Sequence, residues 1–160
     1  MPKPKLDLTL QIACKPSKLR SGELPSRGDF RRWAKAALRG DARVTLRIVD
    51  EAEGRTLNRD YRDKDYATNV LTFAYGFSEG TTAEAAVLTG DIVLCAPVVA
   101  REAAEHNISL AAHYAHLTVH GLLHLQGYDH ESDAEAVMME SIESFLLQRL
   151  GYSDPYTAHC

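Results

Sequence analysis

The chain has 160 residues, of which 45% are hydrophobic and 25% are charged, and its formal net charge is −4. This composition is typical of a folded globular protein and argues against a disordered or membrane-spanning chain. The length predicts a single domain over residues 1–160, large enough to bury a core without disulfides or a structural metal. The charge is uneven, because residues 1–40 carry ten basic and three acidic side chains, whereas residues 41–160 carry eight and nineteen.

The cysteines and the N-terminal residues indicate a cellular compartment. Cys14, Cys95 and Cys160 are odd in number, far apart and without a CxxC pair, which favours reduced thiols. The N-terminus alternates polar and apolar residues and lacks the continuous apolar region of a signal peptide. No stretch approaches the roughly 18 apolar residues of a membrane-spanning helix. We therefore expect a cytoplasmic protein without a membrane partner.

Alternating and helical patterns predict the order of strands and helices. Residues 6–14 alternate polar and apolar side chains, as in a half-buried strand, whereas residues 30–39 repeat apolar side chains at helical spacing. We expect a strand at 6–14, a helix at 30–39, a strand at 44–48, a short helix within 50–65, strands at 70–75 and 92–94, and helices at 97–107, 110–126 and 133–150. This order predicts an α+β fold with one four-stranded mixed sheet and helices packed on it.

The ends of the last two helices carry capping signals. Ser109 is the expected N-cap of the helix at 110–126, and Gly127 is its expected C-terminal cap. Asp133 is the expected N-cap of the last helix. Apolar residues of that helix are expected to form a stripe that faces the core. The stripe consists of Val137, Ile142, Phe145, Leu146 and Leu150.

Histidines are concentrated in and after the helix at 110–126. Five of the seven fall within eighteen residues, namely His113, His116, His120, His124 and His130. A rotation of about 100° per residue brings His113, His120 and His124 within about 40° of one another, with His116 about 40° further round. These side chains are therefore expected on one face of the helix.

Three of these histidines have the spacing of a metal site. His120 and His124 are four residues apart, and Gly127 turns the chain so that His130 can approach the same ion. Three neutral imidazoles leave a coordination position open, which is typical of a catalytic rather than a closed structural zinc site. We predict one Zn²⁺ per chain, at a central helix and the turn that follows it.

Neighbouring residues have more than one interpretation. His113 and His116 are either core histidines or members of the site, where His116 would support a ligand or compete with one. Asp129 either orients a ligand imidazole or forms a turn.

The segment HGLLHLQGYDH, residues 120–130, has the histidine and glycine spacing of the metzincin signature HExxHxxGxxH. One position differs, because Gly121 stands where those peptidases have the glutamate that activates water. This difference disfavours a zinc peptidase but leaves the three histidine ligands in register.

The same segment resembles the defining motif of the YbeY family of bacterial ribosomal RNA maturation factors. Residues 57–75, LNRDYRDKDYATNVLTFAY, and residues 89–103, TGDIVLCAPVVAREA, support the resemblance. It spans about residues 40–151. Thr72 stands where the family commonly has serine, and Leu94 where isoleucine is common.

The resemblance implies a function and a set of site residues. It implies a single-strand-specific, metal-dependent endoribonuclease in rRNA maturation, at the 16S rRNA 3′ end, and in ribosome quality control. His120, His124 and His130 would be the zinc ligands, and Arg62 the catalytic arginine that faces the metal. The implied partners are single-stranded rRNA precursors, the small ribosomal subunit, a ribosomal protein and an assembly GTPase.

The chemistry of these residues suits a phosphodiester. A zinc-type ion polarises the phosphate and lowers the pKa of bound water toward about 7, and the Arg62 guanidinium can hold phosphate oxygens through two hydrogen bonds. Without the resemblance, Arg62 would be interpreted as a surface ion-pair partner of Asp60, Asp63 or Asp65. The alternative function is a non-catalytic, zinc-containing ribosome-assembly factor that works by binding.

Several other residues keep two interpretations. Asp91 either supports nearby ligands or caps a turn. Tyr66, Phe73 and Tyr75 are candidates for stacking on unpaired bases, although Phe73 also fits a core position. The basic residues form either an RNA backbone contact or a solvated surface. They are Arg31, Arg32, Lys35, Arg39, Arg59 and Lys64.

Overall fold

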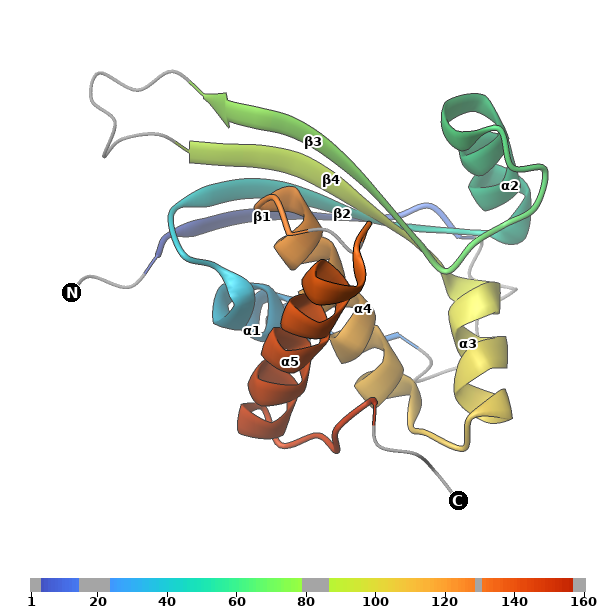
Figure 1. Ribbon diagram of the computed structural model, residues 1–160. Coiled ribbons are helices and arrows are strands. Elements are labelled where there is room, and N and C mark those ends of the chain that lie inside the picture. Colours follow the sequence, from blue (N-terminus) through green and yellow to red (C-terminus); the bar gives the residue numbers. More distant parts are fainter. Residues whose placement is uncertain (1–3, 15–23, 79–86, 129–130, 157–160) are drawn as a thin grey trace.

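The chain forms one mixed β-sheet packed with helices (Figure 1). The computed structural model describes residues 4–14, 24–78, 87–128 and 131–156. The strands are β1 (Leu6–Ile12), β2 (Ala42–Val49), β3 (Val70–Ser78) and β4 (Val87–Cys95). The helices are α1 (Arg27–Ala37), α2 (Glu51–Arg62), α3 (Ala96–Glu105), α4 (Leu110–Leu125) and α5 (Asp133–Arg149). The α+β class and the order of the elements are confirmed.

The strand order in the sheet is β1-β2-β4-β3. β1, β2 and β4 run parallel, and β3 pairs antiparallel with β4. The register of β3 and β4 shifts between Ala74 and Gly76, where Gly76 has a φ of +83° that glycine adopts without strain. Because β3 is last in the strand order, it lies at one edge of the sheet. The loop that leads into β3 comes directly from α2.

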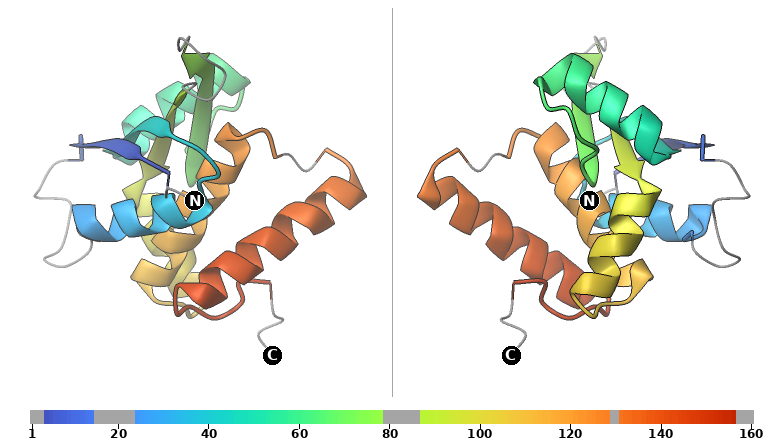
Figure 2. Two further views of the ribbon diagram at one scale, coloured as in Figure 1. Left: turned by 90° about the vertical axis from the view of Figure 1, so that its left-hand side faces the viewer. Right: turned by 90° about the vertical axis from the view of Figure 1, so that its right-hand side faces the viewer.

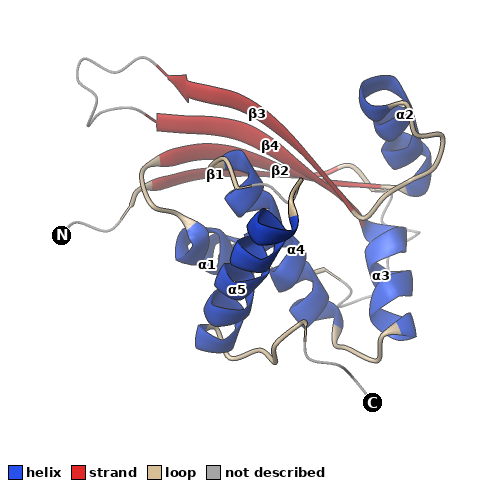
Figure 3. Cartoon of the chain, in the orientation of Figure 1, coloured by secondary structure: helices blue, strands red, loops and turns tan. Residues whose placement is uncertain are grey.

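The two faces of the sheet carry separate apolar clusters. Side chains alternate along β4, so that Ile92 and Leu94 belong to the main core with α1 and α4, whereas Val93 and Cys95 pack with Leu57 of α2. Figures 2 and 3 show α1 and α4 on one face of the sheet, α5 packed outside α4, and α2 toward the other face. Helices from both faces thus reach the neighbourhood of β3.

Two glycines allow α4 to approach the sheet closely. A Cβ atom added at Gly121 would lie 3.0–3.3 Å from three side-chain atoms of Ile92. One added at Gly90 of β4 would lie 2.6 Å from a methyl carbon of Leu125 and 3.0 Å from the carbonyl oxygen of Phe73. The contact between α4 and β4 therefore depends on the absence of side chains at these positions, and it determines how the α4 histidines approach β3.

The buried side of α5 differs from the predicted apolar stripe. Val137 and Phe145 are 63% and 57% exposed, so the prediction that they face the core is wrong. The buried residues of α5 are spaced four apart and comprise Met139, Glu143 and Leu147. The other three residues of the predicted stripe, Ile142, Leu146 and Leu150, are partly buried and pack against the main core as predicted. The apolar pattern missed that the central residue of the buried line is a glutamate.

The helix caps follow the predictions at α4 but not at α5. The Ser109 hydroxyl accepts a hydrogen bond from the Ala112 N–H at 3.0 Å, as expected of an N-cap. At α5 the N-cap is Ser132 rather than Asp133, because the Ser132 hydroxyl accepts the Glu135 N–H at 3.1 Å. The carboxylate of Asp133 instead lies in the first turn, where the helix dipole favours it.

The cysteines agree with a chain of reduced thiols over the part that the structure describes. Cys14 and Cys95 are buried and form no disulfide among the described residues, and Cys160 lies outside those residues. Within the described ranges, no helix combines the length and the apolar character that crossing a membrane requires.

Candidate active site

A cavity of about 530 Å³ lies at the β3 edge of the sheet. The end of α2, the start of β3 and one face of α4 form its wall. The residues that matter for its chemistry are Tyr61, Arg62, Asn69, Phe73, His120 and His124. Three predicted site residues, Arg62, His120 and His124, therefore lie on one cavity although they come from two distant helices.

α4 brings two histidines to the same wall. His120 and His124 are one helical turn apart, and their ring centroids are 4.6 Å apart. His130 and Asp129 lie outside the described residues. Among the residues that are described, no three His, Cys, Asp or Glu side chains form a metal-binding group.

The chain reverses direction at Gly127, as its sequence predicts. Gly127 has a φ of +100°, and its N–H donates to the His124 carbonyl at 3.0 Å. The Tyr128 N–H donates to the Leu123 carbonyl at 3.1 Å. These two bonds form a Schellman motif, in which the left-handed position favours glycine. The course of the chain is thus determined as far as Tyr128, immediately before residues 129 and 130.

Arg62 is an exposed residue at the C-terminal end of α2. The helix ends there because Asp63 adopts a left-handed conformation with a φ of 57°. The buried Asn58 holds the following loop, since its Nδ2 donates to the Tyr66 carbonyl at 2.7 Å. Arg62 therefore extends from a fixed helix end beside the cavity rather than from a loose loop.

Two of the acidic residues near Arg62 in the sequence, Asp60 and Asp65, have other partners. Arg59 pairs with Asp60 at 3.4 Å, and Arg55 binds Asp65 through two hydrogen bonds of 2.8 and 3.0 Å. Within the described part of the chain, Arg62 forms no ion pair. Arg62 is therefore not paired with Asp60, Asp63 or Asp65, contrary to its interpretation as a surface ion-pair residue.

Known proteins match this chain along most of its length. A family model described as Endoribonuclease YbeY matches residues 26–151. The chain belongs to the YbeY family. A protein named Endoribonuclease YbeY from Methylobacillus flagellatus is 64% identical over 135 residues, which cover 84% of this chain and 86% of that relative. Another of the same name, from Nitrosospira multiformis, is 55% identical over 166 residues, covering 99% of this chain and 86% of the relative.

Membership of the YbeY family makes the chain an endoribonuclease, with RNA as its partner. Among solved structures, the solution structure of a Thermotoga maritima protein matches with a TM-score of 0.48 and 25% identity. The match covers 94% of this chain and all of that one. The family assignment depends on the sequence matches alone.

His113 of this YbeY chain lies away from the cavity that His120 and His124 line. It is buried, and its Nε2 lies 2.9 Å from Oε1 of Glu102 in α3. Burial lowers the pKa of His113, and the hydrogen bond to Glu102 opposes that effect. Glu102 also accepts a hydrogen bond of 2.9 Å from Asn69, a residue of the cavity wall. His113 therefore supports the wall through Glu102 and does not itself line the cavity.

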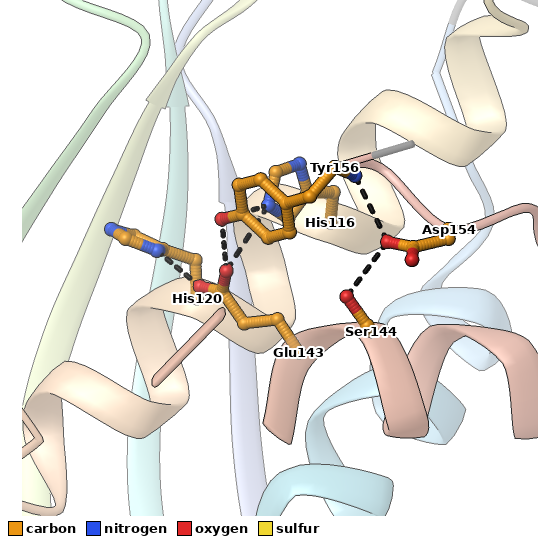
Figure 4. A network of polar contacts seen from close by, with 6 residues as sticks. All are labelled: His116, His120, Glu143, Ser144, Asp154 and Tyr156. Carbon is orange, nitrogen blue, oxygen red and sulfur yellow. Dashed lines mark hydrogen bonds and ion pairs between the residues drawn. The ribbon is translucent and has the colours of Figure 1, made fainter. Parts of the chain in front are cut away.

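Glu143 of α5 is the residue near the site that the sequence patterns missed. Its side chain is fully buried, and its carboxylate accepts hydrogen bonds from His120 Nδ1 and from the Tyr156 hydroxyl (Figure 4). His116 Nε2 lies 3.4 Å from the same carboxylate. Burial alone would raise the pKa of Glu143, but the hydrogen bonds from His116 and His120 lower it to about 2. The carboxyl is therefore ionised, and His116 is one of its partners.

The environment of His120 fits that of a metal ligand. Nδ1 faces Glu143, and Figure 4 shows the other ring nitrogen pointing away from it. Metal-binding histidines commonly donate the hydrogen of their second nitrogen to a carboxylate. A buried carboxylate is also costly unless a positive charge lies near it. A metal ion held by His120 would provide that charge, so the residues present suit a metal site.

Aromatic rings border the cavity. Tyr61, which is 68% exposed, packs edge to face against Phe73 with ring centroids 5.2 Å apart. Both line the cavity, so Phe73 is part of the cavity wall as well as being packed against the smaller apolar cluster. Tyr66 and Tyr75 are exposed but are not among the lining residues. Tyr61 is thus the aromatic residue that the sequence interpretation did not select.

Two other candidates have local partners. Asp91 accepts a hydrogen bond of 2.7 Å from the Tyr75 hydroxyl, which links β4 to β3. Arg31 of α1 donates to the Leu6 carbonyl at 2.8 Å and so stabilises the edge strand β1. β1 lies at the opposite edge of the sheet from β3 and the cavity.

Proposed function

We propose that the chain cleaves single-stranded ribosomal RNA precursors at this cavity, with one zinc ion held by His120, His124 and His130. The observation that carries the proposal is the convergence of Arg62 with His120 and His124 on one cavity in a member of the YbeY family. In this proposal His130, which lies outside the described residues, is the third ligand.

The histidines and Glu143 prepare the metal position. When bound, the ion supplies Lewis acidity at a phosphate oxygen and makes a water molecule more acidic. His120 and His124 offer imidazole nitrogens from successive turns of α4, which suits a shared ion. Glu143 accepts the hydrogen of His120 Nδ1 and so orients that ring.

Arg62 supplies the second positive charge. Its planar guanidinium matches two phosphate oxygens, and among the described residues no carboxylate occupies it. Negative charge on those oxygens grows as the phosphodiester reacts, so a guanidinium at that position stabilises the transition state more than the ground state. Arg62 is accordingly assigned as a catalytic residue.

Tyr61 and Phe73 provide a basis for single-strand selectivity. Unpaired bases can leave the stack and pack on an aromatic side chain, whereas bases in a duplex are already stacked and paired. Such stacking contributes about 1–3 kcal/mol per base. The exposed ring of Tyr61, held against Phe73 beside Arg62, lies where a base next to the bound phosphate would stack.

The charge distribution supports dependence on a ribosomal partner. Residues 41–160, which include the whole cavity, carry eight basic and nineteen acidic side chains. Affinity for naked RNA depends mainly on cations that contact phosphates, so binding should be weak and sensitive to salt. We propose that the small ribosomal subunit, a ribosomal protein and an assembly GTPase present the 16S rRNA 3′ end to the cavity, in the cytoplasm.

Metal content and RNA cleavage test this proposal together. His124→Ala is expected to lose both bound zinc, measured in the purified protein, and cleavage of a single-stranded RNA. His106→Ala changes an exposed histidine at the end of α3 and should retain both. Cleavage at the wild-type rate by metal-stripped protein would contradict the proposal. Unchanged zinc content in His124→Ala would reject the ligand set.

A further inference from the structure

A buried hydrogen-bond network joins α4, α5 and the C-terminal segment behind His120 (Figure 4). Glu143 accepts hydrogen bonds from His120 Nδ1 and from the Tyr156 hydroxyl. His116 Nε2 lies 3.4 Å from Glu143 Oε2 and 3.1 Å from the Tyr156 hydroxyl oxygen. The phenol has one hydrogen and donates it to Glu143, so its oxygen accepts from His116. His120 Nδ1 and the Tyr156 hydroxyl therefore donate to the carboxylate, and His116 donates to the phenol oxygen beside it.

We propose that Glu143 is a positioning residue that fixes His120 as the Nδ1–H tautomer, and that Tyr156 completes its hydrogen bonding from the C-terminal segment. Oε1 of Glu143 faces His120 Nδ1 while Oε2 accepts the Tyr156 hydroxyl, so the carboxylate acts as the acceptor on both sides and this geometry places the shared hydrogen on His120 Nδ1. The lone pair of the neutral ring is then on Nε2, which points away from Glu143. The part of this inference that concerns zinc rests on the proposed function, whereas the tautomer does not.

The C-terminal segment is anchored next to the carboxylate that it covers. Asp154 Oδ1 accepts hydrogen bonds from Ser144 Oγ at 2.7 Å and from the Tyr156 N–H at 2.9 Å. Ser144 follows Glu143 directly in α5. Glu143 is fully buried while Tyr156 is 42% exposed, so the phenol separates the carboxylate from solvent. Residues 153–156 thereby become part of the site although they follow α5.

A role in folding alone explains Glu143 less well. The carboxylate sits between Met139 and Leu147 in the buried line of α5, where an apolar residue would fit. Among the described residues its ion-pair partners are the imidazoles of His116 and His120, and no lysine or arginine pairs with it. A buried carboxylate without a cationic partner is costly. The cost of burying the Glu143 carboxylate is offset when His120 binds a metal cation next to it.

The tautomer can be measured without metal. Two-bond ¹H–¹⁵N spectra of metal-free protein, at a pH where imidazole is neutral, distinguish Nδ1–H from Nε2–H rings. His120 should be the Nδ1–H form in the wild type. Glu143→Gln should give a mixture, because an amide can either accept from Nδ1 or donate to it. A wild-type His120 in the Nε2–H form would overturn the inference, whatever metal binds.

Zinc affinity, measured by competition with a chromogenic chelator, gives the second readout. Loss of a carboxylate that orients a ligand typically weakens metal binding by about 10–100-fold, and we expect this of Glu143→Gln. Glu140→Gln is the matched control, because Glu140 is an exposed carboxylate of the same helix and lines a second, smaller pocket together with His120 and Glu143. It should stay within about twofold of the wild type. Equal affinities of Glu143→Gln and Glu140→Gln would overturn the positioning role.

Tyr156→Phe keeps the test decisive if Glu143→Gln does not fold. This variant removes the hydroxyl that donates to Glu143 and keeps the aromatic ring. Zinc affinity should therefore fall by several-fold, and His120 should become a mixture of the two tautomers. If Tyr156→Phe has the zinc affinity and the spectrum of the wild type, Tyr156 has no part in positioning His120. If His120 is the Nδ1–H form in a wild-type protein that does not bind zinc, the proposed function fails while the positioning of His120 stands.

Discussion

Replacing Gly121 with alanine tests whether close packing of α4 on β4 determines the residue at this position. The added Cβ would lie 3.0 Å from Ile92 Cδ1, 3.2 Å from Cγ2 and 3.3 Å from Cγ1. Ile92 is fully buried, so it cannot move without disturbing its neighbours. Overpacking of this kind costs about 1–3 kcal/mol, whereas alanine gains about 1 kcal/mol over glycine in a helix interior. We therefore expect Gly121→Ala to lower the free energy of unfolding by up to about 2 kcal/mol.

Gly28→Ala in α1 is the matched control. The nearest atom to its added Cβ is the Ser26 hydroxyl oxygen at 3.7 Å, an ordinary contact. This variant should be at least as stable as the wild type, because it gains helix propensity without overpacking. Urea unfolding of the metal-free proteins, followed by far-ultraviolet circular dichroism, gives both free energies. If Gly121→Ala proves as stable as Gly28→Ala, the packing argument for Gly121 is wrong.

Two further predictions concern stability. Gln126 joins the ends of α1 and α4, since its Oε1 accepts the Arg39 N–H at 2.9 Å and its Nε2 donates to the Ala37 carbonyl at 2.7 Å. Gln126→Ala should lower the free energy of unfolding by about 1–3 kcal/mol, and an unchanged urea midpoint would refute this. Burial raises the pKa of the Cys95 thiol to about 11, above its ordinary value of 9.0. The native state then holds the thiol proton more tightly than the unfolded chain, so this contribution is complete below pH 9 and is lost as the pH rises through 11. The stability of the wild type relative to Cys95→Ala should fall over that interval, and a constant difference would show that the fold does not perturb the thiol.

Periodicity was sufficient for the fold because most elements bury one face. Leu6 and Leu8 at the start of the first alternating segment, and the helical repeat at Phe30, Trp33 and Ala37, are buried in the core as predicted, whereas Ile12 at the end of the strand is 55% exposed. It failed at α5, where Val137 and Phe145 are exposed and the buried line contains Glu143. A glutamate four residues after Met139 and four before Leu147 was the available signal. A pattern that counts only apolar residues assigns such a carboxylate to solvent.

The site was predictable in part. Spacing along one helix identified His120 and His124, because residues four apart share a helix face. That Arg62 reaches the same cavity depends on α2 ending at Asp63 beside the edge strand, a tertiary relation that no local pattern contains. The same limit applies to the partner of His113, because Glu102 belongs to α3 and spacing within α4 does not reveal it.

RNA cleavage by Arg62→Gln, compared with Arg59→Gln, tests the central claim most directly. Both arginines lie in the last turn of α2, but Arg59 pairs with Asp60 and does not line the cavity. Each variant removes one positive charge, so general weakening of RNA attraction is matched. We predict that Arg62→Gln keeps its fold and its zinc while cleavage of single-stranded RNA falls by about 100-fold or more, and that Arg59→Gln stays within a few-fold of the wild type. Equal cleavage rates for the two variants would contradict an active site built from Arg62, His120 and His124.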